Sequence, residues 1–493
     1  MTAYSYQVLA IAIYFSAMLA IGYYAYRQTS DLDDYMLAGR KLKPGVAALS
    51  AGASDMSGWL LMGLPGAIYA SGLVESWIVI GLVIGAYLNW RFVAPRLRTY
   101  TAISNNSITV PSFFENRFRD KTRLLRITAG IIILVFFTFY VSSGMVAGGV
   151  FFESSFNSTY LFGMLLVAGI TLTYTLFGGF LGATLTDVAQ GILMFVALIT
   201  VPIATIIAMG GFGEVFTAID AADAAENLNR TSLFFGGSVL AVISAAAWGL
   251  GYFGQPHIIV RFMALRSAKD AKAGRRIGIS WMVLTATGAI TTALVGIGYF
   301  HANPATLANP ETVFLRLSQI MFHPLIAGFI LAAVLAAIMS TVSSQLIVCS
   351  SALVEDIYKI FGKEASPQRY VLYGRIGVLT VALVAGLLAL NPGGTILQLV
   401  GFAWAGFGAA FGPLILLSLF WRKLTANGAL AGMITGAVVV GIWGNIDALK
   451  GVMYEIVPGF VACLVVAVAV SLLVPRPDEG VQDEFTEMEA AMR

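Results

Sequence analysis

Asp55 is the only charged residue in the long apolar stretch 45–70. Serine, glycine and alanine fill most of the run around it, from Ser50 to Trp59, and Gly63, Pro65 and Gly66 follow. Glycine and serine weaken a continuous helix, and a carboxylate inside a membrane is costly and usually functional. A face of small residues for helix packing would explain the glycines but not the carboxylate. The run is therefore interpreted as an interrupted membrane helix that lines a cavity.

A second interruption is predicted between Trp248 and Pro256. This stretch contains three glycines, Gly249, Gly251 and Gly254. Their spacing matches the dinucleotide-binding pattern G-x-G-x-x-G, but no strand precedes it, which excludes that function. Flexible glycines between Trp248 and Tyr252 predict instead an unwound turn that presents aromatic faces to a cavity. A purely structural kink is the alternative.

A group of hydroxyl side chains forms the third feature, because Ser340, Thr341 and Ser344 lie on neighbouring helical positions. Hydroxyls that bond to the carbonyls of their own helix are the structural alternative. Hard cations prefer oxygen ligands, and backbone carbonyls freed near Ala53 and Met56 would complete a shell. A site with no carboxylate directly on the ion suits a monovalent cation such as sodium.

Membrane helices must position these three features. Of the 493 residues 58% are hydrophobic and only 11% are charged, and the mean hydropathy is +0.84, so the chain could not cover a water-soluble surface. The net charge of +3 is too small to indicate a nucleic-acid partner. The two cysteines, Cys349 and Cys463, lie in apolar runs, which excludes a disulfide framework.

Windows of about 20 apolar residues, the length that crosses a bilayer, predict thirteen spans. They cover 4–26, 45–70, 72–93, 125–149, 160–180, 185–209, 234–255, 276–300, 321–348, 373–391, 396–421, 428–446 and 452–474. The first window lacks the basic start and the cleavage site of a signal peptide, so it is expected to be a retained span.

The distribution of basic residues predicts the orientation. All but three of the 29 Lys and Arg fall in alternate connections and the tail, and only Arg230, Arg316 and Lys450 fall on the other side. The N-terminus is therefore expected outside and the C-terminus in the cytoplasm. Arg261 is assigned here to the cytoplasmic loop after the seventh span. The stretch from Phe113 to Arg126 is expected to lie along the membrane interface as an amphipathic helix, and the acidic tail is expected to be solvated or disordered.

Four long motifs carry a family resemblance. They are Leu49 to Gly66, Gly249 to His257 with Arg261 to Ala264, Ala336 to Thr341, and Ala403 to Pro413. Through them the chain resembles the sodium/solute symporter family and, within it, the bacterial sodium/proline symporters.

The resemblance implies an all-α integral membrane protein with thirteen transmembrane helices and a LeuT-like core of two inverted five-helix repeats. Interruptions five helices apart are what such a repeat predicts. The expected parts are 1–44, the first helix and a cytoplasmic loop; 45–210, the first repeat with helices 2–6; 234–421, the second repeat with helices 7–11; 428–474, two peripheral helices; and 475–493, the acidic cytoplasmic tail.

The resemblance also implies roles for single residues. Sodium would be held by Ala53, Met56, Ala337, Ser340 and Thr341; the substrate by Ser57, Gly58, Tyr140, Trp248, Tyr252 and Pro256; and coupling would involve Asp55, Arg40 and Asp187. From the residues alone, Arg40 could equally be a positive-inside anchor, and Asp187 could compensate a helix dipole.

The expected function is import of L-proline coupled to sodium, by alternating access in the bacterial cytoplasmic membrane. Sodium is the coupling ion, and no organic cofactor, enzymatic activity, nucleic acid or obligate protein partner is expected. The alternative is a sodium- or proton-coupled importer of another small amino or carboxylic acid. Proton coupling is disfavoured because His257, His301 and His323 are all assigned near span ends. A membrane enzyme is disfavoured because the spans show no nucleophile–base set. A sensor is disfavoured because the tail is too short for a signalling domain. A channel would be recognised by currents faster than a carrier cycle.

Overall fold

The chain is helical throughout the residues that the computed structural model describes, which are 2–28, 37–303, 307–361, 366–475 and 479–492. One isolated parallel β-bridge, between Leu42 and Leu265, is found in this part of the chain. Of the basic residues assigned to the cytoplasmic side, Lys363, Arg476 and Arg493 lie outside the described residues.

The helices follow one another along the chain with short connections. In order they are α1 (Ala3–Tyr26), η1 (Ala38–Arg40), α3 (Pro44–Asp55), η2 (Trp59–Gly63), α4 (Leu64–Ser71), η3 (Leu73–Ser76), α5 (Trp77–Leu88), η4 (Asn89–Val93), α6 (Ala94–Ile103), α7 (Val110–Phe118), α8 (Leu124–Phe156), α9 (Tyr160–Ala208), α10 (Phe212–Glu226), α11 (Val239–Ala246), η5 (Ala247–Phe253), α12 (Pro256–Met263), η6 (Ala268–Asp270), α13 (Ala271–Ala302), η7 (Pro310–Thr312), α14 (Val313–Met321), α15 (Pro324–Ser351), η8 (Ala352–Tyr358), α16 (Lys359–Phe361), α17 (Pro367–Ala389), α18 (Ile396–Phe420), α19 (Ala426–Trp443), α20 (Asp447–Lys450), α21 (Ile456–Leu473) and α22 (Glu479–Ala491).

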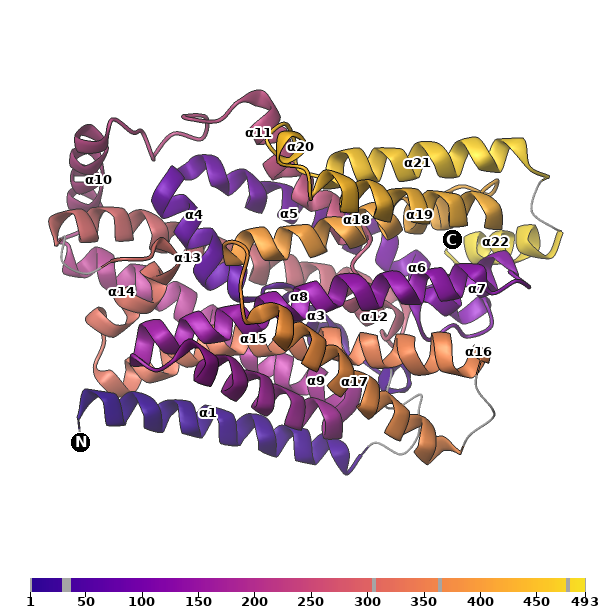
Figure 1. Ribbon diagram of the computed structural model, residues 1–493, viewed down its shortest axis with the longest axis horizontal. Helices are drawn as coiled ribbons and strands as arrows, with labels where there is room; N and C mark the ends of the chain where they lie inside the picture. Colours follow the sequence, from indigo (N-terminus) through magenta and orange to yellow (C-terminus); the bar gives the residue numbers. More distant parts are fainter. Residues whose placement is uncertain (1, 29–36, 304–306, 362–365, 476–478, 493) are drawn as a thin grey trace.

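The predicted membrane spans are confirmed, with ends that differ by several residues. In the described residues ten helical segments are long and apolar enough to cross a membrane. One of them, α9, contains two of the predicted spans, because Gly179 at φ 57° interrupts its helical backbone. The two interrupted helices supply the remaining spans. Figure 1 shows the long helices running side by side along the longest axis of the molecule.

The predicted interruption of the second span is confirmed. Helix α3 ends at Asp55, and Met56 leaves the helical region with ψ of 74°. The helix resumes with the π-turn η2 and continues as α4 to Ser71. The residues between, Ser57 and Gly58, are buried among protein atoms, as broken backbone at membrane depth requires.

The seventh span is also interrupted, but not in the way the sequence suggested. The glycine-rich stretch is wound tightly as the 3₁₀-helix η5, and the break falls at Gly254 and Gln255, before α12 begins at Pro256. The glycines provide close packing: a Cβ on Gly249 would come within 2.1 Å of the Gly81 carbonyl, and one on Gly251 within 1.9 Å of the Trp404 indole nitrogen.

This span continues beyond the predicted end at residue 255, because α12 extends it to Met263. Arg261 and His257 are therefore both buried inside the protein. The assignment of Arg261 to a loop was wrong, because it lies in α12. A paired arginine is tolerated inside the bundle, so its charge does not mark the end of the helix.

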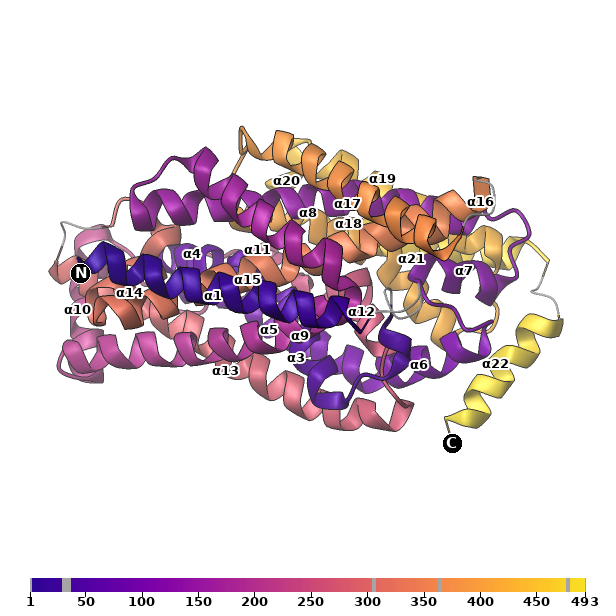
Figure 2. The ribbon, with the colours of Figure 1, turned by 90° about the horizontal axis from the view of Figure 1, so that it is seen from below.

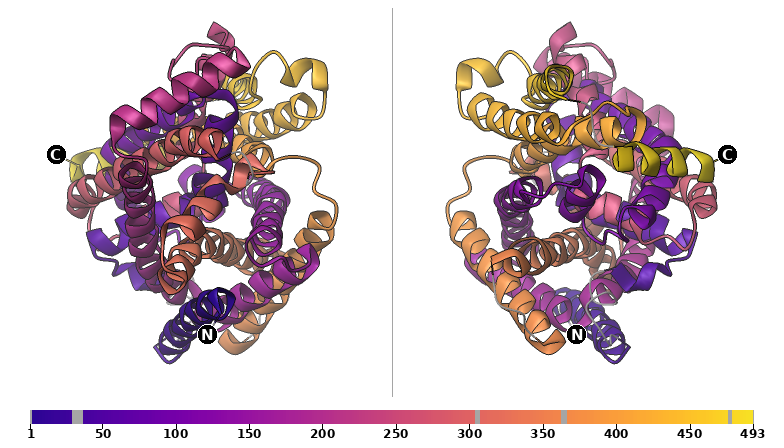
Figure 3. Two further views of the ribbon diagram at one scale, coloured as in Figure 1. Left: turned by 90° about the vertical axis from the view of Figure 1, so that its left-hand side faces the viewer. Right: turned by 90° about the vertical axis from the view of Figure 1, so that its right-hand side faces the viewer.

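Two helices form the centre of the bundle. The most apolar windows of the α15 and α18 segments are 83% buried, against 33–39% for α1, α17, α19 and α21. Helix α15 packs against α1, α3, α8, α9 and α17, which places its hydroxyl residues between several other helices. Seen along the bundle, α1 lies at one side and the pair α19 and α21 at another, as Figure 3 shows.

The basic connections lie at one end of the bundle. Figure 1 shows α6, α7, α16 and α22 together at the right-hand end and α10 and α14 at the left-hand end. The N-terminus lies at the left-hand end of the same view, so the described chain starts and finishes at opposite ends. Which end faces the cytoplasm stays a prediction from the basic residues.

Two expectations about the basic end need correction. The stretch from Phe113 to Arg126 does not form one amphipathic helix, because α7 ends at Phe118 and α8 begins at Leu124. Phe113 and Phe114 are fully buried in α7, and Arg117 lies over the ring of Tyr100 at 5.1 Å. These aromatic side chains find protein partners, which replace the lipid contact that an amphipathic helix would make.

The acidic tail is not disordered in its described part, where it forms α22 (Glu479–Ala491), although acidic residues such as Asp483 and Glu487 are exposed as a solvated segment would have them. Figure 2 shows this helix crossing the end of the bundle near α6. Phe485 is buried beneath it against Tyr100, and Arg119 pairs with Glu484 at 2.9 Å. The apolar residues of the tail, spaced one helical turn apart, bury one face of a helix whose acidic face meets basic residues.

Candidate functional site

The hydroxyl residues of α15 contact the interrupted end of α3. Ser340 Oγ donates a hydrogen bond to the Ala53 carbonyl at 2.7 Å. The Ala337 carbonyl accepts from Ser340 Oγ at 3.1 Å and from Thr341 Oγ1 at 3.2 Å. Four of the five residues predicted to hold sodium therefore contribute oxygen atoms to one cluster. The fifth, Met56, is fully buried at the end of the same helix.

This cluster can offer a cation two carbonyl and two hydroxyl oxygens without a carboxylate. Oxygen donors of this kind suit a hard ion of low charge. Ser340 Oγ lies within hydrogen-bond distance of two carbonyls, and an ion bound here would replace these hydrogen bonds by direct contacts. The structural alternative, hydroxyls bonded to their own helix, describes Thr341 but not Ser340, which also bonds across to α3.

Asp55 connects the two interrupted helices. Its Oδ2 accepts a hydrogen bond from the hydroxyl of Tyr252 on η5, and its backbone carbonyl accepts from Trp59 Nε1 at 3.1 Å. The carboxylate is fully buried, and its Oδ1 has no hydrogen-bond partner among the described residues. A buried charge with one free oxygen favours a nearby positive charge.

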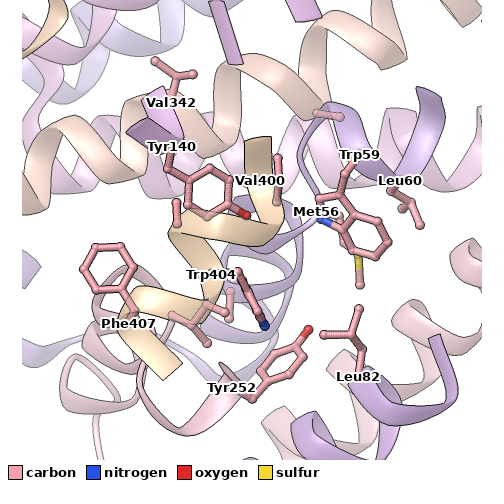
Figure 4. Packing of buried hydrophobic residues seen from close by; sticks show 14 of the residues in the cluster. Met56, Trp59, Leu60, Leu82, Tyr140, Tyr252, Val342, Val400, Trp404 and Phe407 are labelled. Carbon is pink, nitrogen blue, oxygen red and sulfur yellow. The ribbon is translucent and has the colours of Figure 1, made fainter. Parts of the chain in front are cut away.

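Aromatic side chains pack around this point. The ring of Trp248 stacks on that of Tyr454 with centroids 5.3 Å apart, and it lies 6.3 Å from the rings of Trp59 and Trp404. Trp404 Nε1 donates to the Trp248 carbonyl at 2.8 Å and fixes the 3₁₀ turn. Figure 4 shows Trp404, Tyr252 and Trp59 around Met56.

The predicted substrate residues Ser57, Gly58 and Tyr140 lie close to this cluster. Gly58 is in contact range of Ala147 on α8 and Ile338 on α15. Tyr140 comes from α8, and Figure 4 shows its hydroxyl pointing toward the region between Met56 and Trp404. A small cavity of about 20 Å³ lies beside Met56 and Tyr252 and has room for about one water molecule.

Pro256 and Arg40 lie apart from this cluster. Pro256 starts α12 and lines a different cavity, together with Thr109 and Asp356. Arg40 lies at the basic end, where it donates to the Met263 carbonyl at 3.0 Å and to the Ser107 carbonyl at 2.6 Å. It thereby joins the end of the seventh span to the segment after α6.

Asp187 belongs to a buried polar network that the sequence did not indicate. Its Oδ2 accepts from Ser50 Oγ at 2.7 Å and from Arg261 Nη2 at 3.1 Å. The same guanidinium nitrogen donates to Ser344 Oγ at 2.6 Å. The network links α3, α9, α12 and α15, and its arginine was missed because it was assigned to a loop.

Trp404 and Tyr454 were also missed as site residues. Trp404 lies within the motif from Ala403 to Pro413, which consists mainly of small residues, and it is the one aromatic residue there whose ring carries an N–H donor. That contrast could have identified it, because small neighbours let a large ring approach another helix closely. Nothing in the local sequence around Tyr454 distinguishes it from an ordinary interfacial tyrosine.

Comparison with known proteins places this geometry in a family. Residues 35–436 match the model of the sodium:solute symporter family. The chain is 56% identical over 476 residues to the high-affinity proline transporter PutP of Bacillus subtilis, covering 96% of this chain and 100% of that protein. It is 50% identical to the osmoregulated proline transporter OpuE of the same organism, covering 99% and 98% of the two chains. It is 49% identical to a sodium/proline symporter of Staphylococcus aureus, covering 98% and 96%.

Solved structures share the fold. A substrate-bound, outward-open Na⁺-coupled sialic acid symporter matches with a TM-score of 0.81 at 19% identity, covering 96% of this chain and 99% of that one. Mhp1, a nucleobase-cation-symport-1 family transporter in a closed conformation, matches with a TM-score of 0.54 at 15% identity, covering 92% and 98%. The fold is therefore that of the LeuT-like transporters, as the family resemblance implied. On the family model and on relatives that are about half identical over nearly their whole length, this protein belongs to the sodium:solute symporter family.

Proposed function

We propose that this protein is a sodium-coupled symporter that imports L-proline across the cytoplasmic membrane of a bacterium by alternating access. The observation that carries the proposal is the 49–56% identity, over 96% or more of both chains, to proteins named as proline transporters or sodium/proline symporters. The protein is a membrane transporter and not an enzyme.

Sodium is proposed to bind between α3 and α15. Its ligands would be the carbonyls of Ala53, Met56 and Ala337 and the hydroxyls of Ser340 and Thr341. The proposal is supported by the contact between Ser340 and the Ala53 carbonyl, because an ion there would connect the interrupted helix to the centre of the bundle. Asp55, without direct contact to the ion, would contribute a favourable negative field.

Proline is proposed to bind beside this ion. Its carboxylate would meet backbone N–H groups or hydroxyls around Ser57 and Gly58, and its ring would pack against Trp248, Tyr140 and Tyr252. The hydrogen bond from Tyr252 to Asp55 supports the proposal, since it ties the substrate side of η5 to the ion side of α3. Each ligand would thus favour the arrangement that the other requires, which is thermodynamic coupling.

The roles of the remaining predicted residues are also proposals. Arg40 and Asp187 would act on the cytoplasmic side, where Arg40 already holds the end of the seventh span. Pro256 would act at the break between η5 and α12, and not among the aromatic side chains around Trp248. The N-terminus would lie outside and the C-terminus in the cytoplasm, which the gathering of basic connections at one end of the bundle supports.

Uptake by the purified protein in proteoliposomes tests this function. Labelled L-proline is expected to accumulate under an inward sodium gradient and not when potassium replaces sodium. Competition with other amino acids, pantothenate and sugars then establishes the substrate. Uptake driven equally well by a pH gradient without sodium, or displacement of proline by a tighter-binding solute, would contradict the proposal.

A further inference from the structure

A cavity lies between the interrupted seventh span and the end of the bundle where the basic residues gather. Pro256 and Val260 of α12, Phe180 of α9 and Ser351 of α15 line it, together with Thr109 and Asp356. Its volume of about 20 Å³ holds about one water molecule or ion of similar size. Most of its wall is apolar, so the few polar atoms that face it determine what it can hold.

Asp356 is the one charged side chain of this wall, and it is fully buried. Its Oδ1 accepts from Thr109 Oγ1 at 2.8 Å and from Arg126 Nε at 2.9 Å. Its Oδ2 has no hydrogen-bond partner among the described residues. A buried carboxylate oxygen in this position favours a ligand that supplies a proton or a positive charge.

The charges around Asp356 belong to one shared network of ion pairs. The guanidinium of Arg126 is shared among three carboxylates, since it also bonds to Glu115 at 2.7 Å and to Glu355 at 3.1 Å. Lys359 pairs with Glu355 at 2.5 Å, and Arg123 lies 3.8 Å from Glu115, both nearer the surface. The three carboxylates and three cations balance formally, and Asp356 Oδ2 is the buried oxygen that no donor among the described residues reaches.

The cavity follows the proposed sodium site along the same helix. Ser351 lies eleven residues beyond Ser340 on α15, or about 16 Å at the rise of an α-helix. The wall is formed by α12 and α9, the segments that follow the breaks at Gly254 and Gly179. The cavity therefore lies on the same helix as the proposed site, about three turns closer to the basic end.

We propose that Asp356, with the Thr109 hydroxyl, forms a transient site for a monovalent cation on its way to the cytoplasm. The cation is sodium, which fits a cavity of this size; the ammonium group of the substrate, which carries the same charge, is the alternative that the test distinguishes. The site lowers the barrier to release and takes no part in binding from outside. This inference rests on the proposed function and on the orientation proposed with it.

Asp356→Asn tests the site, because it keeps the shape and the acceptor for Thr109 but removes the charge. In proteoliposomes that hold the parent protein, sodium-driven uptake and proline counterflow must both be measurable; if they are not, the proposed function fails and not this inference. In the variant we expect the maximal rate of net uptake to fall about tenfold, equal to ~1.4 kcal/mol in the barrier. The half-saturating sodium concentration outside is expected to stay as in the parent.

Counterflow with equal sodium on both sides distinguishes the two cations, since it needs proline release but not sodium release. Counterflow that stays near the parent rate identifies sodium, and counterflow that falls as much as net uptake, with normal sodium binding, identifies the substrate. Glu355→Gln is the matched control, because it removes a partner of the same Arg126 that does not line the cavity, and we expect it to keep the parent rates.

Two results would overturn the inference. Net uptake unchanged in Asp356→Asn would mean that the cavity holds water only. A loss of rate accompanied by an equal loss in Glu355→Gln, or by a lower unfolding temperature of Asp356→Asn, would mean that the carboxylate serves only to hold Arg126 and α7 in place.

Discussion

Removing the hydroxyl of Tyr252 tests whether the contact between the two interrupted helices is part of sodium coupling. In Tyr252→Phe the ring stays, but Asp55 Oδ2 loses its donor while Oδ1 already has none among the described residues. A hydrogen bond to a charged group contributes about 1.5–3 kcal/mol. If the sodium-loaded arrangement needs the ionised carboxylate held there, the half-saturating sodium concentration is expected to rise about 10- to 150-fold, at about 1.4 kcal/mol for each factor of ten.

The assay is initial proline uptake against external sodium, with the protein level in the membrane measured in parallel. Tyr160→Phe is the matched control, because it loses a hydroxyl that donates to the Ala389 carbonyl at 2.7 Å, a neutral bond to the peripheral helix α17. That bond contributes about 1 kcal/mol to stability and has no connection to Asp55. A sodium dependence of Tyr252→Phe that matches the control would refute the reasoning.

Three further variants examine the proposed ion site, the aromatic cluster and the buried ion pair. Thr341→Val is expected to raise the half-saturating sodium concentration about tenfold through loss of one oxygen ligand, with membrane insertion unchanged; unchanged sodium dependence would remove Thr341 from the site. Trp248→Ala is expected to weaken proline binding about tenfold at saturating sodium, because the ring contacts are lost; equilibrium binding of labelled proline measures this, and an unaltered affinity would exclude Trp248 from the pocket. Arg261→Gln leaves Asp187 buried without its charge partner and is expected to destabilise the protein by about 3–5 kcal/mol, which a thermal unfolding assay detects; adding Asp187→Asn is expected to recover part of the loss, and a double variant no more stable than Arg261→Gln would argue against the pair.

The spans were predictable because their signal is local. A bilayer requires about twenty consecutive apolar residues, and a run of that length can be recognised directly in the sequence. The interruption after Asp55 was predictable for the same reason, since glycine, serine and a carboxylate in one apolar run conflict with a continuous helix. The 3₁₀ winding of η5 was not predictable, because it depends on Gly249 meeting Gly81 across another helix.

The position of a charged residue was predicted correctly only where it does not depend on a partner far away in the chain. Arg261 and Arg117 were assigned to the aqueous side on their charge, yet both are buried. Arg261 finds Asp187, which lies 74 positions away in the chain, and Arg117 finds aromatic rings. The helix in the acidic tail was missed for the same reason, because its partners are Tyr100 of α6, Arg119 just after α7 and Arg422 just after α18.

The sequence by itself determined that this is a membrane protein of many helices, that two of them are interrupted, and which oxygen-rich segment is the candidate to hold a small cation. It did so because hydropathy and backbone preference act over a few residues. Tertiary structure alone decided that Ser340 reaches Ala53, that Tyr252 reaches Asp55, and that Asp356 faces a cavity beyond them. Those contacts depend on the angles and distances between helices far apart in the chain, which close packing of the whole bundle sets and no single segment encodes.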